Sequence, residues 1–293
     1  MKNKIDGSYY GYTLLPRTYT SYRWYKPLLT ALLLLFFYFL FFGILVSIVS
    51  VLKPENNTNA FLSTSLSYDN MDAYSGLGAL MQIGSTAIIL PALLISVRII
   101  KERPFSSYSS SNGGWNWYTF FKSILISIIV CSVFYIIGFF AGGVPLQENI
   151  LFDTSGLIVL TIMLPIQCIA EEYLFRGFLM QTFGAWFGKP IIAIILQSAC
   201  FALFHPYNIN GMVAIFISGI IYGTIVHKTG GLEAVCAIHI LTNYIAFYSS
   251  GFGFSKVTSN VDTLSLIISV AMDVVFALAV LGIVKKKIGG NVL

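Results

Sequence analysis

The chain has 293 residues, of which 57% are hydrophobic and 10% are charged. A soluble domain carries about 25% charged residues, so this composition excludes a soluble protein and indicates an integral membrane protein. The net charge of +5 could suggest nucleic-acid binding. However, the basic residues lie in short segments between apolar stretches, where membrane topology accounts for them. We therefore expect a lipid bilayer and no nucleic acid as partner.

Eight apolar stretches are long enough, or nearly so, to cross a hydrocarbon core of about 30 Å at about 1.5 Å per residue. They predict an all-α, polytopic membrane protein with about eight transmembrane helices. The stretches are 27–52, 77–100, 118–141, 155–180, 190–205, 211–228, 231–249 and 263–285, and the fifth is the shortest.

The first part of the chain predicts an anchor and a scaffold. Residues 1–26 are rich in Tyr and in basic residues, a mixture typical of the membrane interface. Residues 27–141 hold three almost purely apolar spans and predict a helical scaffold. When the N-terminus is placed on the inner side of the membrane, only Lys53 and Lys256 of the 17 Lys and Arg residues lie on the outer side. This asymmetry predicts that both termini are cytoplasmic.

The stretch "CIAEEYLFRGF" places three charged residues inside the fourth span. An ionisable residue in a span costs at least about 2.5–3.5 kcal/mol on insertion scales, so each is a functional candidate. Glu172 and Arg176 are four residues apart, with the acid first, and this spacing predicts an ion pair on one helix face. Glu171 lies about 100° away on the helix and lacks that partner. It could therefore act as a general base.

Further polar residues follow in the later spans. His205 ends "FALFHP", where Pro206 predicts a helix end, and His239 and Asn243 in "HILTN" share one helix face. A carboxylate near a histidine can deprotonate water, and donors opposite can hold the oxyanion of a tetrahedral intermediate. These residue types alone leave open a hydrolase site or a proton or ion pathway. Asp273, in the final span over 263–285, either pairs with a polar group or lines a cavity.

The predicted spans place two of these residues at different depths. By rise per residue, Glu171 lies near the inner side of the membrane and His205 nearer the outer side. For the two to meet, span four must extend past the inner surface, or span five must start below it. The side from which a substrate arrives is open.

Other protease chemistries fit less well. The sequence contains neither HExxH, as in zinc proteases, nor GxGD, as in aspartyl membrane proteases. Cys168 precedes Glu171 by three positions and Cys236 precedes His239 by three, so a Cys–His nucleophile is geometrically conceivable. A zinc site of Glu171, His205 and His239 is a further alternative. We expect no metal and no other cofactor.

Three motifs occur in order on successive late spans. "EEYLFR" fits EExxxR, "FALFH" fits FxxxH, and "HILTN" fits HxxxN. Between the last two, "FISGIIYG" sets two glycines four residues apart, a close-packing motif of membrane helices. Over residues 155–250 the sequence thus resembles the CPBP family. This family comprises the CAAX prenyl proteases and the bacteriocin-processing or immunity proteins, and is also called the Abi family.

The resemblance implies an intramembrane glutamic endopeptidase in a bacterial cell membrane, acting on a peptide or protein substrate that could itself be membrane-associated. A catalytically idle immunity or regulatory member of the family is the first alternative, and a proton or solute transporter is the second. Carried over by motif position, Glu171 is the general base, His205 assists it, His239 and Asn243 hold the oxyanion, and Glu172 and Arg176 have a supporting role.

Overall fold

The computed structural model describes residues 11–52, 72–142, 150–256 and 258–289. These residues form helices joined by short connections, and the described part contains no strand beyond one isolated bridge between Ser110 and Gly231. The all-α fold is therefore confirmed. The elements are the 3₁₀ helix η1 (Tyr12–Thr18), α1 (Lys26–Leu52), α3 (Gly76–Ala87), α4 (Ile89–Ile100), α5 (Ser106–Ser109), α6 (Trp117–Gly142), α7 (Thr154–Glu172), the π-helix η2 (Tyr173–Leu179), α8 (Met180–Phe187), α9 (Pro190–Leu203), α10 (Ile209–Thr229), α11 (Glu233–Gly251) and α12 (Thr263–Gly289).

Each of the eight predicted apolar stretches coincides with one or more of these helices. Six helical stretches in the described residues are long and apolar enough to cross a membrane, which confirms a polytopic membrane protein. The helix α9 has 14 residues, about 21 Å of rise, and is shorter than the hydrocarbon core. The helix α11 carries the polar His239 and Asn243. That these two helices also cross the membrane stays a prediction.

The helices α7, η2 and α8 form one continuous stretch of 34 residues, Thr154–Phe187. Its rise of about 51 Å exceeds the hydrocarbon core, so the fourth span is long enough to extend past the inner surface. Gly188, at φ 68°, then reverses the chain in the left-handed conformation that glycine favours, and Pro190 begins α9. Glu171 and His205 lie equally many residues before and after Gly188. The hairpin therefore brings the two motifs to a similar level.

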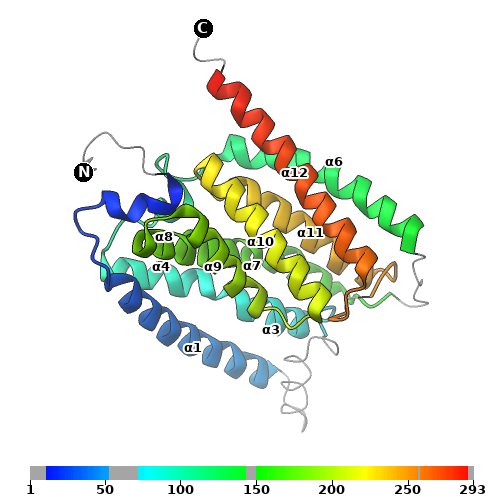
Figure 1. The fold of residues 1–293 in the computed structure, drawn as a ribbon. Helices are drawn as coiled ribbons and strands as arrows, with labels where there is room; N and C mark the ends of the chain where they lie inside the picture. The colour runs from blue at the N-terminus through cyan, green and yellow to red at the C-terminus, as the bar shows by residue number, and fades with distance from the viewer. Residues whose placement is uncertain (1–10, 53–71, 143–149, 257, 290–293) are drawn as a thin grey trace.

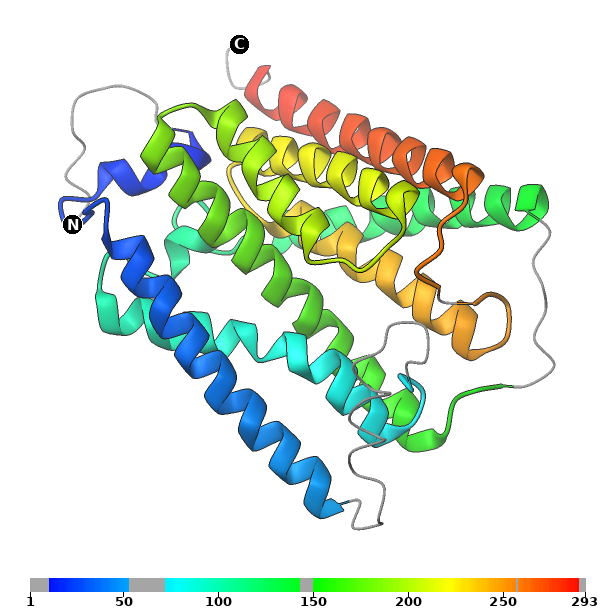
Figure 2. The same ribbon diagram turned by 60° about the horizontal axis from the view of Figure 1, so that its bottom comes forward.

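Figures 1 and 2 show how the remaining helices surround this hairpin. The helix α1 lies along one edge and packs on α4, while α3 packs against α7. On the other side, α10 lies between α9 and α12, and α11 contacts α6 and α7. The four helical segments that carry the predicted motifs, α7–η2, α9, α10 and α11, therefore pack against one another.

The helices α9 and α10 approach each other closely through the two glycines of the FISGIIYG segment. A Cβ atom on Gly219 would lie 2.8 Å from Ser198 Cβ, and one on Gly223 would lie 2.9 Å from Gln197 Nε2. Both distances are too short for a larger side chain. The predicted close-packing role of these glycines is confirmed.

Large apolar side chains cover the outer surfaces of the peripheral helices. Leu32 and Phe36 of α1, Ile129 of α6 and Leu278 of α12 are all exposed by more than half. In water such a surface would be unfavourable, whereas in a bilayer it contacts lipid chains of equal polarity. These faces fit a chain embedded in a membrane.

The described part of the predicted N-terminal interfacial segment is also packed against the helices. Tyr12 is buried, and its hydroxyl donates to the backbone carbonyl of Tyr108. Arg17 Nε donates to the carbonyl of Ala185 at 2.7 Å, which ties the segment to the end of α8. Residues 1–10 lie outside the described part of the chain.

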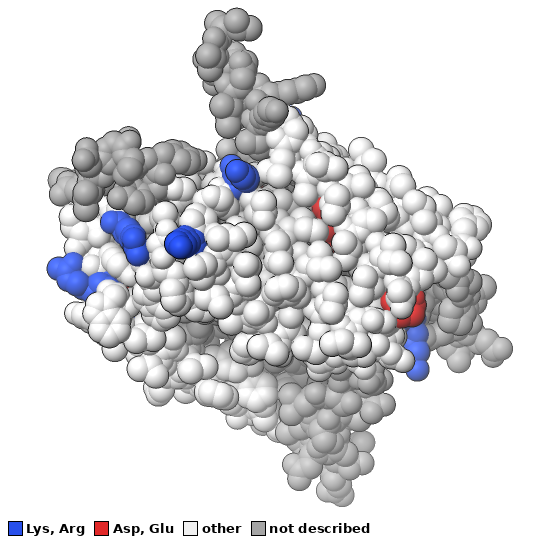
Figure 3. Space-filling model, viewed as in Figure 1, with Lys and Arg blue, Asp and Glu red and all other residues white. Residues whose placement is uncertain are grey.

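Basic residues gather at one end of the molecule. Figure 3 shows Lys and Arg on the visible face concentrated toward the end where α1 begins and α8 ends. This distribution agrees with the loop asymmetry of the sequence, and the cytoplasmic location of both termini stays a prediction. Of the cations in that prediction, Lys2, Lys4 and Lys53 lie outside the described residues.

Candidate active site

The two glutamates of the first motif lie where α7 passes into the π-helix η2. Glu171 and Glu172 are the last residues of α7, and both are buried. In η2 the backbone N–H of Met180 bonds the carbonyl of Phe175, five residues earlier. Such widened turns inside α-helices are frequent at functional sites.

Glu172 and Arg176 form the predicted ion pair, which is confirmed. Arg176 Nη1 donates to Glu172 Oε1 at 3.1 Å, and neither side chain is exposed at all. The guanidinium lies 4.1 Å above the Phe201 ring and 5.5 Å from the Tyr222 ring. Cation–π contacts of this kind stabilise a desolvated cation. The pair is therefore part of the packed interior of the bundle.

Glu171 does not pair with Arg176 in the described residues, as predicted, but it has two other partners. Gln167 Nε2 donates to Glu171 Oε1 at 2.5 Å, and His239 Nε2 lies 3.6 Å from Glu171 Oε2. The helical wheel excluded Arg176 as a partner but ignored an amide one turn earlier and a histidine from another helix. Within the described residues, Glu171 Oε2 accepts no hydrogen bond and is buried. One oxygen of this carboxylate is therefore held, and the other is available.

His239 lies between the two glutamates. Its Nδ1 is 2.8 Å from Glu172 Oε1, and its Nε2 faces Glu171. Because an ionised carboxylate can only accept, Nδ1 carries the proton and donates to Glu172. Glu172 therefore fixes both the orientation and the tautomer of His239, a function beyond neutralising Arg176.

Asn243 lies one turn further along α11 and contacts the same region. Its Nδ2 is 3.3 Å from Cys168 Sγ and 3.4 Å from Gln167 Oε1. Gln167 therefore connects the carboxylate of Glu171 with the amide of Asn243. Sequence reasoning missed Gln167, although its position four residues before Glu171 on the same helix face was a usable signal.

His205 lies beside this cluster and not within it. Its Nδ1 is 2.7 Å from the carbonyl of Phe201, so Nδ1 carries the proton and Nε2 keeps its lone pair. The Phe201 ring is 4.6 Å from the His205 ring and 6.3 Å from the His239 ring. No hydrogen bond or ion pair in the described residues joins His205 to Glu171 or His239. The structure thus brings Glu171, His239 and Asn243 together and leaves His205 across the Phe201 ring.

Asp273 pairs with polar groups of α10, one of the two possibilities that the sequence left open. Ser218 Oγ donates to Asp273 Oδ2, and Tyr222 Oη donates to Oδ1 at 3.0 Å. Tyr222 also lies beside Arg176. Asp273 therefore holds two residues of α10, one of which lies beside the ion pair. It forms no hydrogen bond or ion pair with Glu171 or His239 among the described residues.

Neither candidate cysteine forms a hydrogen bond with a histidine nitrogen in the described residues. Cys168 Sγ contacts Gln167, Asn243 and the backbone carbonyl of His239, the last at 3.7 Å. Cys236 is fully buried. Within the described residues, no group of three His, Cys, Asp or Glu side chains is placed to hold a metal ion. The metal-free site and the catalytic roles of the motif residues stay predictions.

The match to a known family covers this site. Residues 153–245 match the family model of the type II CAAX prenyl endopeptidases, termed Rce1-like. This match confirms the resemblance of these residues to the CAAX prenyl proteases of the CPBP family. The Rce1-like segment runs from the N-cap of α7 into α11, so it contains every residue of the three motifs.

One curated relative extends the match. The uncharacterized protein YyaK of Bacillus subtilis is 30% identical over 169 residues, which cover 53% of this chain and 55% of that protein. The chain thus spans about half the length of this relative. No solved structure matches the chain.

Proposed function

We propose that the protein is an intramembrane endopeptidase in which Glu171 activates the water that cleaves a peptide bond. The observation that carries this proposal is the arrangement of one carboxylate. Glu171 Oε1 is held by Gln167, while Oε2 is buried, accepts no hydrogen bond from a described residue and lies 3.6 Å from His239 Nε2. A positioned carboxylate oxygen with free accepting capacity is what a general base requires.

The chemistry follows from these positions. Glu171 Oε2 takes a proton from water, and the resulting hydroxide oxygen bonds to the carbonyl carbon of the substrate. The carbonyl oxygen becomes an oxyanion, which needs donors aimed at it. The tetrahedral intermediate then collapses, the C–N bond breaks, and Glu171 returns its proton to the leaving nitrogen. Atoms and protons balance without any further reactant.

Asn243 and His239 are the proposed oxyanion donors. The contacts of Asn243 Nδ2 with Cys168 and Gln167 are long, at 3.3 and 3.4 Å, so a charged oxygen would compete well for this amide. His239 donates from Nδ1 to Glu172 and can donate from Nε2 only when it is protonated. The cluster of Glu171, Glu172 and Arg176 favours that cation, because protonated His239 balances two carboxylates against two cations.

His205 is proposed to assist in orienting the water. Its bond to the Phe201 carbonyl leaves Nε2 as an acceptor. Since the Phe201 ring contacts both histidines, this role requires that ring or the His205 side chain to move when substrate binds. The proposed substrate is a peptide or protein in or at the membrane, and the proposed location is a bacterial cell membrane.

Replacing Glu171 by Gln tests the proposal. The protein would be purified in lipid nanodiscs and incubated with a library of prenylated and unmodified peptides, and the products would be identified by mass spectrometry. We expect cleavage by the wild type and none by E171Q, with an unchanged melting temperature. The matched control is E233Q, which neutralises a different buried glutamate that forms no ion pair in the described residues. Its amide oxygen can still accept from the Asn116 N–H, so E233Q should retain cleavage.

Other outcomes identify the alternatives. Equal processing by wild type and E171Q would reject the protease. A biological function that survives E171Q would point to a binding role as an immunity or regulatory protein. Proton-coupled solute uptake into vesicles that depends on Glu171 would instead support a transporter.

A further inference from the structure

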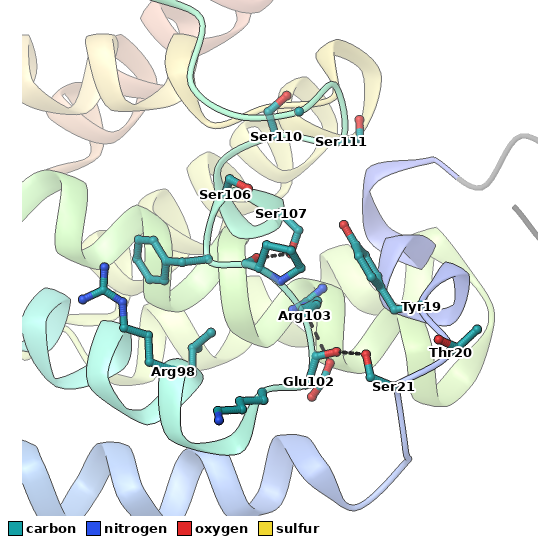
Figure 4. A pocket seen from close by; sticks show the side chains of 15 residues that line it. Tyr19, Thr20, Ser21, Arg98, Glu102, Arg103, Ser106, Ser107, Ser110 and Ser111 are labelled. Atoms are coloured by element: carbon teal, nitrogen blue, oxygen red, sulfur yellow. Dashed lines mark hydrogen bonds and ion pairs between the residues drawn. The ribbon is translucent and has the colours of Figure 1, made fainter. Parts of the chain in front are cut away.

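A second site lies at the basic end of the molecule. A pocket of about 790 Å³ is formed there by residues 19–21 after η1, residues 97–105 around the end of α4, and residues 106–113 including α5 (Figure 4). Small-molecule sites have volumes of about 300–1,000 Å³. None of the candidate active-site residues lines this pocket.

Two of the charged residues in the pocket wall neutralise each other. Arg103 Nε lies 3.5 Å from Glu102 Oε1, and both side chains are almost fully buried. Arg103 also donates to Gln181, and its guanidinium lies 3.8 Å from the centre of the Tyr108 ring. The ion pair of Glu102 and Arg103 therefore has a structural role and adds no net charge to the pocket.

Two further cations in the wall are left uncompensated. Arg98 and Lys101 are both exposed, and neither makes a hydrogen bond or ion pair with any described residue. The pocket wall therefore carries a net charge of +2, from Arg98 and Lys101. A concave surface lined by one sign of charge concentrates ions of the opposite sign.

Hydroxyl groups complete the wall. The side chains of Thr20 and Ser106 line the pocket and make no hydrogen bond with a described residue. Each can donate to an anionic oxygen. The wall thus offers several donors, including an Arg whose planar fork matches phosphate. Arg98 and Thr20 lie on opposite sides of the pocket (Figure 4), and the carboxylate of Glu102 is buried beside Arg103. The chemistry of the wall thus favours an anion with several oxygen atoms.

The pocket also lies where several apolar helices begin or end. Its segments adjoin the points where the apolar spans of α1, α4 and α6 begin or end, at Lys26, Ile100 and Trp117. Trp24 and Trp117, close to these points, are 67% and 63% exposed, as is typical of aromatic residues at a membrane interface. Basic pockets between helices at this depth commonly bind anionic headgroups.

The backbone at Lys101 gives a second indication. It is at φ 53°, and no other non-glycine residue in the described chain has a positive φ. This position ends α4, where glycine is the usual and less strained residue. Here a lysine occupies it, and its side chain lines the pocket.

We propose that this pocket binds a phosphate group, supplied by the headgroup of an anionic phospholipid or by free phosphate. The proposal is independent of the proteolytic function, because it concerns other residues and its test needs no substrate. Arg98 and Lys101 provide the charge, and the hydroxyls of Thr20 and Ser106 provide further donors.

The test measures ligand-dependent stability of the full chain in neutral detergent. Melting temperatures would be recorded against increasing dioctanoyl phosphatidylglycerol, dioctanoyl phosphatidylcholine or inorganic phosphate for the wild type, R98Q, K101G and the double variant. Glycine suits the backbone of residue 101, so K101G should fold at least as well as the wild type. K189Q, at an exposed cation on the turn before α9, is the control for loss of one charge.

A ligand that binds the folded state raises the melting temperature. We expect phosphatidylglycerol to do so, with R98Q and K101G each requiring roughly tenfold more lipid for the same shift, as suits the loss of one charged hydrogen bond, and K189Q behaving as the wild type. Inorganic phosphate acting in the same residue-dependent way would identify free phosphate as the ligand. An equal shift in the wild type and the double variant, or equal stabilisation by phosphatidylcholine, would overturn the proposal.

Discussion

Neutralising Glu172 alone should strongly destabilise the fold, because it leaves a buried cation without its counter-ion. Arg176 Nη1 is 3.1 Å from Glu172 Oε1, and both side chains are wholly buried. In E172Q the side-chain shape is kept, and the amide oxygen can still accept from His239 Nδ1. The change therefore isolates the loss of charge. Removing one partner of a buried pair costs about 3–5 kcal/mol.

The contacts of Arg176 with aromatic rings do not offset this loss. The Phe201 and Tyr222 rings already contact the guanidinium in the wild type, so they provide no new compensation in the variant. At roughly 2–4 °C per kcal/mol for large domains, we expect the melting temperature of E172Q to fall by on the order of 10 °C. Differential scanning fluorimetry in detergent measures this shift.

The double variant E172Q/R176M provides the decisive comparison. It removes both charges and fills the space with a flexible apolar chain, so it should recover more than half of the stability lost in E172Q. The reasoning would be refuted by an E172Q variant within about 1 kcal/mol of the wild type. A double variant no more stable than E172Q would refute it equally.

Three further predictions concern other parts of the structure. Gln167→Ala should reduce kcat for peptide cleavage by roughly 10–100-fold with little change in KM, because the Glu171 carboxylate stays but loses the hydrogen bond that orients it. An unchanged kcat would exclude this positioning role of Gln167. Gly219→Ala should lower the stability by about 1–3 kcal/mol through overpacking. The control Gly282→Ala should not destabilise the protein, because a Cβ there meets nothing within 4 Å. Equal melting temperatures of the two variants would contradict the close contact between α9 and α10. Burial raises the pKa of Glu102 above its ordinary value of 4.5, so the folded state binds this proton more tightly and loses stability as the pH rises through the raised pKa. Between about pH 5 and 8 the melting temperature of E102Q should therefore fall less than that of the wild type. Parallel curves of melting temperature against pH would contradict this.

Local spacing predicted several of these features correctly. The apolar runs gave the helices, because a span must satisfy its backbone hydrogen bonds internally and be long enough to cross the core. The Glu172–Arg176 pair followed from a separation of four residues on one helix. The close approach of α9 and α10 followed from Gly219 and Gly223. In each case the interaction depends on residues near one another in sequence or on the absence of a side chain.

Tertiary packing determined the features that spacing did not give. That His239 lies between the two glutamates depends on how α11 packs against α7, which no local pattern encodes. The π-helical turn after Glu172 is likewise an outcome of packing. Gln167 and Phe201 are the exceptions, because Gln167 lies four residues before Glu171 and Phe201 four residues before His205, and both spacings were visible in the sequence.

The central claim is that Glu171 activates a water that cleaves a peptide bond. Single-turnover cleavage in ¹⁸O-labelled water, with both product and protein analysed by mass spectrometry, tests it most directly. The wild type should place one ¹⁸O atom in the new carboxyl terminus of the product and none in Glu171, while E171Q should give no product. Cleavage by E171Q, or ¹⁸O found in the Glu171 side chain, would contradict the mechanism.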